Sequence, residues 1–156
     1  MKVHSLLSED LIFGGLEGRT RDDVLREMSG RFCGRTGPVA CDVLLAKLLE
    51  REGLGTTAIG GGVAIPHCKV EGLEAPVLML GLSREGVSFR SVDGQDTHVI
   101  FLLVSPLEKP EANLQVLAAI AKLARRSRTL AARLFQASTP AETLRTLREI
   151  EDGRHA

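Results

Sequence analysis

The segment from Ile59 to Cys68, IGGGVAIPHC, contains the histidine best placed for chemistry. Three glycines lead into a short apolar stretch that ends at Pro66 and His67. Proline fixes its own φ and keeps the preceding residue extended, so His67 should lie at the tip of a strand on a stiffened backbone. A neutral imidazole is nucleophilic near neutral pH and can carry a transferred group. The pattern makes His67 a candidate nucleophile, although a histidine after a proline is more often an ordinary loop residue.

Arg51 is a second candidate, at the end of a predicted helix. Residues 39–52 have helical spacing and are followed by Gly53, a common helix terminator. Arg51 follows Leu44 and Leu48 at i, i+4 and i+7, and so extends their apolar stripe. Two interpretations remain open: the guanidinium complements the negative end of the helix dipole, or it reaches an anion.

The elements that must position these residues follow from capping and periodicity. Helices are predicted at residues 20–32 and 39–52, from residue 110 onward, and at 127–135 and 139–150, with a break at 34–38. Thr20, Ser127 and Thr139 are the predicted N-caps of the helices that they begin. Strands are predicted as a glycine-interrupted hairpin at 58–65, central strands at 76–83 and 97–105, and a short strand at 87–89 before a turn at 93–94.

This order predicts a single α/β (α+β) domain over residues 1–156, with a mixed β-sheet flanked by helices on both sides. Its core should span about residues 5–151, and the polar tail at 152–156 should fray. The chain is 44% apolar and 26% charged, a balance typical of globular domains.

Composition argues against several classes of partner. Lys plus Arg equals Asp plus Glu at 20 each, and Trp and Tyr are absent, so neither a nucleic acid nor an anionic membrane surface is indicated. The longest apolar runs, such as Val99–Val104, are far shorter than a membrane span, and no signal sequence opens the chain. We therefore expect a cytoplasmic protein without membrane insertion.

The three cysteines, Cys33, Cys41 and Cys68, have unrelated spacings and predict neither a metal site nor a disulfide framework. Cys41 is expected to be a small buried residue of its helix. Cys68 adjoins His67, but adjacent side chains rarely aim at each other, which weighs against a Cys-His hydrolase. His98 lies inside an apolar strand and is expected to be structural.

The segment from Arg51 to Gly60, REGLGTTAIG, continuing through Ala64–His67, resembles the phosphorylation site of the fructose/mannitol-type (type 2) enzyme IIA domain of the bacterial phosphotransferase system. Further segments resemble the opening, the middle hairpin and the central strand of that family: residues 7–12, 87–89 with 93–94, and 99–104. The length resembles that of the free-standing nitrogen-regulatory or fructose-like members.

The resemblance implies that His67 is the phosphohistidine and Arg51 the active-site arginine. Members accept a phosphoryl group from HPr or a paralogue and pass it to a IIB domain, or use the phosphorylated state as a signal. Thr57 would offer a hydroxyl and an N–H to phosphate, and Gly60–Gly62 would let the backbone approach closely. No metal or other cofactor is needed, because the donor is itself a phosphohistidine.

Asn113 departs from the family pattern. Members commonly carry a second active-site histidine in the first turn of the helix after the central strand, where this chain has Asn113. Asparagine can donate a hydrogen bond but cannot become cationic. Asn113 therefore favours one alternative to a phosphocarrier, a regulatory protein-binding module with weak or vestigial phosphorylation.

Overall fold

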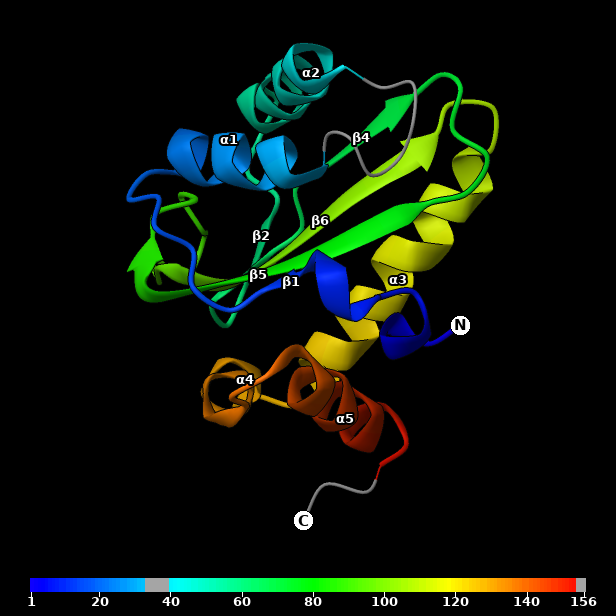
Figure 1. Ribbon diagram of the computed structural model, residues 1–156. Helices are drawn as coiled ribbons and strands as arrows, with labels where there is room; N and C mark the ends of the chain where they lie inside the picture. Colours follow the sequence, from blue (N-terminus) through cyan, green and yellow to red (C-terminus); the bar gives the residue numbers. More distant parts are fainter. Residues whose placement is uncertain (33–39, 154–156) are drawn as a thin grey trace.

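A mixed β-sheet lies at the centre of the molecule, with helices against both of its faces (Figure 1). The computed structural model describes residues 1–32 and 40–153. In these residues the sheet has six strands: β1 (Ile12–Phe13), β2 (Ala58–Gly60), β3 (Val63–Ala64), β4 (His67–Val70), β5 (Val77–Val87) and β6 (Thr97–Pro106). The helices are α1 (Arg21–Phe32), α2 (Cys41–Gly53), α3 (Pro110–Arg126), α4 (Leu130–Gln136) and α5 (Pro140–Glu151), with short 3₁₀ helices η1 (Val3–Ser5) and η2 (Glu9–Leu11). The predicted mixed sheet flanked by helices is confirmed.

Strand β6 connects the rest of the sheet. It pairs antiparallel with β5 and parallel with both β3 and β4, while β1 lies beyond β5 and β2 beyond β3. Its side chains alternate between two hydrophobic cores, one containing Val99, Phe101 and Leu103 and the other Ile100, Leu102 and Val104. Because both faces are covered, the strand is apolar throughout rather than at alternate positions.

The two faces of the sheet carry different layers. Helices α1 and α2 cover one face, and α3, α4, α5 and η1 pack on the other (Figure 1). Helix α2 packs on β4, and α3 packs on β6. The carboxyl half of α2 and the first turn of α3 therefore flank the strand that begins at His67. None of the helices in the described ranges is long and apolar enough to span a membrane.

Helix starts agree with the predicted caps in two cases and differ in a third. The hydroxyl of Thr20 accepts from the N–H of Asp23 at α1, and that of Thr139 accepts from the N–H of Glu142 at α5. Ser127 was predicted to cap the next helix, but that helix, α4, begins only at Leu130. Ser127 is instead a buried residue at the end of α3, so its burial overrides its local capping propensity.

The strands differ from the prediction at two places. Residues 67–70 form β4, which was not predicted, because its four residues gain their regularity from pairing with β6 rather than from local periodicity. Strand β5 continues beyond the segment predicted at 76–83 as far as Val87, with a register shift between Leu82 and Val87, and the separate strand predicted at 87–89 does not form. A local irregularity of this kind bends a strand without ending it.

Some predicted boundaries lie outside the described residues: Cys33, the break at 34–38, the helix start at Val39, and residues 154–156. Within the described part, α2 begins at Cys41. Asp152 and Gly153 remain ordered at the end of α5, since the N–H of Asp152 donates to Arg148 and that of Gly153 to Ile150. The φ of Gly153 is 76°, a left-handed helix ending that glycine adopts without strain.

The N-terminal segment is held against α5 by the buried carboxylate of Glu151. Its oxygens accept from the N–H of Val3 at 2.6 Å, the N–H of His4 at 2.9 Å and Nδ1 of His4 at 2.7 Å. The bonds join the two ends of the described chain across about 147 residues of sequence. Because this contact belongs to the layer of α3 and α5, it contributes to stability without touching α2.

We predict that Glu151→Ala destabilises the fold by about 2–3 kcal/mol, because it leaves buried donors without an acceptor. Thermal or denaturant unfolding measures the change. Glu149→Ala, a partly exposed position on the same helix, should cost less than about 0.5 kcal/mol. Equal stabilities of the two variants would show that Glu151 does not anchor the N-terminal segment.

Candidate functional site

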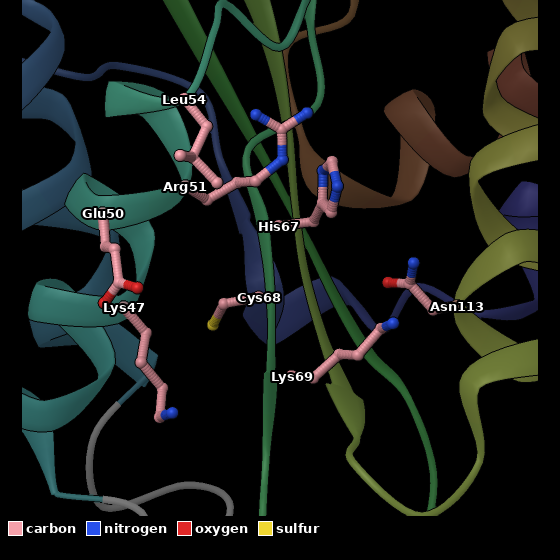
Figure 2. A pocket seen from close by; sticks show the side chains of 8 residues that line it. All are labelled: Lys47, Glu50, Arg51, Leu54, His67, Cys68, Lys69 and Asn113. Carbon is pink, nitrogen blue, oxygen red and sulfur yellow. The ribbon is translucent and has the colours of Figure 1, made fainter.

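A cleft of about 330 Å³ lies between α2 and α3, with β4 as its floor (Figure 2). Eight side chains line it: Lys47, Glu50 and Arg51 from α2, Leu54 from the following loop, His67, Cys68 and Lys69 from β4, and Asn113 from α3. The fold therefore brings together three of the four predicted site residues, His67, Arg51 and Asn113. These residues are separated by up to 62 positions in the chain (113 − 51).

His67 is half-buried at the start of β4, and one ring nitrogen already has a partner. Nδ1 lies 2.7 Å from the carbonyl oxygen of Ile65. A carbonyl oxygen can only accept, so in the neutral ring Nδ1 carries the hydrogen. Nε2 then holds the lone pair and is the nucleophilic nitrogen. The backbone is fixed here because the carbonyl of Pro66 accepts from the N–H of Leu103 at 2.9 Å in β6.

The surroundings lower the pKa of His67 below its ordinary value of 6.5. Burial is the largest cause, because it disfavours the charged imidazolium. The hydrogen bond to Ile65 acts in the opposite direction, as does the carboxylate of Glu52, while the positive charges of Arg51 and Lys69 lower the pKa further. His67 is consequently neutral, with Nε2 free to attack, at neutral pH.

Arg51 presents its guanidinium to the same cleft as His67 (Figure 2). Its Nη1 donates to the carbonyl oxygen of Gly55 at 2.9 Å, which ties the side chain to the loop after α2. In the described part of the chain no carboxylate pairs with it, so its other N–H groups remain available. Lys47 and Lys69 add two cations against the single carboxylate of Glu50. The cleft is therefore suited to a dianion such as a phosphoryl group.

Asn113 lies in the first turn of α3, as predicted, and is only 4% exposed. Its Oδ1 accepts a hydrogen bond from the hydroxyl of Ser105 at 3.1 Å, which fixes the side-chain amide at the edge of the cleft. With Oδ1 engaged, the amide nitrogen is the group that can serve a ligand, as a hydrogen-bond donor.

Thr57 does not line the cleft. It is buried, and its N–H and hydroxyl both donate to the carboxylate of Glu52. The glycines at 60, 61 and 62 also lie away from the cleft lining, and all three have positive φ, Gly60 at the end of β2 and the other two in the turn that leads to β3. Left-handed backbone explains glycine at these positions without a ligand.

The cysteines do not support a Cys-His hydrolase. Burial raises the pKa of the Cys68 thiol to about 12, an effect that Lys47 only partly offsets, so the thiolate is absent at neutral pH. Cys41 was predicted to be a small buried residue of its helix. It is instead exposed at the first residue of α2 and disulfide-bonded, so the prediction was wrong. Helix boundaries are uncertain by one or two residues, so periodicity says little about burial in the first turn of a helix.

Sequence reasoning missed Lys47 and Lys69, although a signal for each was present. Lys47 precedes Arg51 by four residues and so shares its face of α2. Lys69 follows His67 by two residues and so shares its side of β4. The described ranges contain no group of three or more His, Cys, Asp or Glu side chains that could hold a metal ion.

We predict that an NMR titration of His67 gives a pKa below 6.5. Arg51→Gln should raise this pKa, because removing a nearby positive charge makes imidazolium less costly. Arg145→Gln, at an exposed position of α5, should leave it unchanged. A wild-type pKa above 6.5 would contradict the proposed effect of burial.

Comparison with known proteins gives a consistent result. The family model "Phosphoenolpyruvate-dependent sugar phosphotransferase system, EIIA 2" matches residues 5–150. The chain is 35% identical over 125 residues to a nitrogen regulatory protein of Bradyrhizobium diazoefficiens, an alignment that covers 80% of this chain and 81% of that protein.

Two solved structures share the fold. The nitrogen regulatory protein IIA-Ntr from Neisseria meningitidis matches with a TM-score of 0.82 and 26% identity, over 93% of this chain and 98% of that one. The complex of enzyme IIA mannitol with phosphorylated enzyme IIB mannitol from Escherichia coli matches with a TM-score of 0.73 and 20% identity, over 91% and 96% of the two chains. The family predicted from the segment ending at His67 is thereby confirmed: the chain belongs to the type-2 enzyme IIA family of the phosphoenolpyruvate-dependent sugar phosphotransferase system.

Proposed function

We propose that this IIA-type protein is a phosphocarrier that accepts a phosphoryl group on Nε2 of His67 from an HPr-like phosphohistidine protein. It then passes the group to a IIB domain or uses the phosphorylated state as a regulatory signal. The observation that carries the proposal is the hydrogen bond between Nδ1 of His67 and Ile65, because it leaves Nε2 as the free nucleophile in a cationic cleft.

The transfer step needs only the two imidazoles. The lone pair of Nε2 attacks phosphorus in line with the P–N bond of the donor phosphohistidine. As the new N–P bond forms, the old one breaks, and its electron pair returns to the donor ring, which can then take up a proton. Positive charge develops on the ring of His67, and the Nδ1–H bond to Ile65 stabilises that charge.

The cations of the cleft stabilise the transferring group. The guanidinium of Arg51 offers a planar pair of donors to the equatorial oxygens, and Lys47 and Lys69 contribute positive charge. The amide of Asn113 adds a neutral donor from α3. Thr57 remains a proposed part of this site, with an indirect role considered below.

The rim of the cleft carries exposed apolar side chains that could contact a partner protein. Leu54 is 81% exposed at the end of α2, and Leu114 is 66% exposed beside Asn113. Two exposed apolar residues beside the charged side chains of the cleft suit a small interface that forms and releases quickly, below roughly 1,200 Å² in total. The Escherichia coli IIA mannitol complex, in which a protein of this fold binds a phosphorylated IIB, supports a IIB domain as one acceptor.

A regulatory output is the second candidate. Relatives named nitrogen regulatory proteins match the chain, and Asn113 stands where the family resemblance implies a second histidine. Phosphorylation with a regulatory readout requires His67 and Arg51 but not rapid onward transfer. The same histidine chemistry therefore serves both candidates.

Phosphorylation should be confined to His67. Incubation with a phosphorylated HPr-like donor should add one phosphoryl group to the wild-type chain, and nitrogen–phosphorus NMR should place it on Nε2. His67→Ala should abolish the adduct, whereas His4→Ala, in the opposite layer, should retain it. An unchanged yield in His67→Ala would refute the assignment.

Asn113→His should add a titratable group to the site and produce a new pH dependence of single-turnover transfer between about pH 6 and 7. Asn113→Ala should lower the rate by the equivalent of about 1–2 kcal/mol, the scale of one hydrogen bond to a charged group. Gln115→His, at an exposed position on the same helix, is the matched control and should keep the wild-type profile. Identical pH profiles for both histidine variants would place Asn113 outside the reaction.

A further inference from the structure

Glu52 is a buried carboxylate directly after Arg51, and the reaction proposed above does not use it. Arg51 turns to the cleft, whereas Glu52 is only 3% exposed and turns inward. Its oxygens accept the N–H of Thr57 at 3.3 Å and the hydroxyl of Thr57. A buried carboxylate is costly to desolvate unless it is well hydrogen-bonded, so the pair must hold this loop firmly.

The contact of Glu52 with Thr57 continues to the nucleophile. The carbonyl oxygen of Thr57 accepts from the N–H of Ile65 at 3.0 Å. The carbonyl oxygen of Ile65 in turn accepts from Nδ1 of His67 at 2.7 Å. Each connection is a hydrogen bond or the peptide backbone of one residue, so the position of Glu52 is transmitted to the ring of His67.

The same loop also fixes the arginine. Nη1 of Arg51 donates to the carbonyl oxygen of Gly55, and the N–H of Gly55 donates to the backbone oxygen of Glu52. Residues 54–57 are therefore tied to the last turn of α2 through Gly55 and through Thr57. The last turn of α2 therefore helps to position both the guanidinium of Arg51 and the imidazole of His67.

We propose that Glu52 is a positioning residue that acts through Thr57 and Ile65 to orient His67 and to keep its Nδ1 protonated, so that Nε2 is the nucleophile. Thr57 then serves the site indirectly, because its hydroxyl donates to Glu52 rather than to phosphate. The inference rests on the proposed function, since it explains how His67 is prepared to accept a phosphoryl group. The protonated nitrogen of His67 can nevertheless be identified without any phosphoryl donor.

The test compares variants by ring-nitrogen NMR of His67 in the intact protein at a pH where the imidazole is neutral. In the wild type the hydrogen should reside on Nδ1. Glu52→Ala and Thr57→Val should shift the ring toward a mixture with the Nε2–H form, and should slow single-turnover transfer roughly tenfold to a hundredfold, as small misplacements do. Thr57→Ser, which keeps the hydroxyl, should restore both the Nδ1–H form and the rate.

Glu151→Ala is the matched control, since it also removes a buried carboxylate that accepts backbone N–H groups. It should lower the melting temperature but leave the Nδ1–H form of His67 and the rate per folded molecule unchanged. If Glu52→Ala does not fold, Thr57→Val decides the question, because it removes only the hydroxyl and keeps the side-chain shape.

A folded Glu52→Ala or Thr57→Val protein with His67 still wholly in the Nδ1–H form would overturn the inference, whether or not its transfer rate falls. Failure of the proposed function gives a different result. In that case the wild type would accept no phosphoryl group from the donor, while the shift of the ring hydrogen in Glu52→Ala would still be observed.

Discussion

The hydrogen bond from Nδ1 of His67 to the carbonyl of Ile65 is the interaction on which the site depends. It engages one nitrogen of the ring and leaves the lone pair on the other, the nitrogen that we propose as the nucleophile. Ile65 and Pro66 connect two short strands, β3 and β4, and the pairing of both strands with β6 helps to hold the carbonyl of Ile65 beside the ring of His67. The buried strand β6 therefore helps to fix the geometry of the cationic cleft.

Electrostatics at the cleft reflects a balance between burial and charge. Burial and the charges of Arg51 and Lys69 lower the pKa of His67, while Ile65 and Glu52 act the other way. A cationic cleft attracts a phosphoryl group and also keeps the imidazole unprotonated. Both effects favour an acceptor that is neutral before the reaction and surrounded by positive charge during it.

The amino-acid sequence by itself predicted the family, the helices and the central strands, and it singled out His67 as the candidate nucleophile. The resemblance that carried these predictions lies mainly within one continuous segment, from Arg51 to His67, and could therefore be recognised without knowledge of long-range contacts. The apolar run at 97–105 predicted a strand covered on both faces, and β6 has that position. The caps at Thr20 and Thr139 were also predictable, because a cap is satisfied within three residues.

Only the tertiary structure decided which side chains meet and what each one does. Strand β4 exists because β6 pairs with it, and the place of Asn113 at the cleft depends on how α3 packs on β6. The sequence suggested that the hydroxyl of Thr57 donates a hydrogen bond to phosphate. In the structure this hydroxyl donates to the carboxylate of Glu52. Sequence spacing limits which contacts are possible, but burial decides whether a polar group faces a ligand or another buried group.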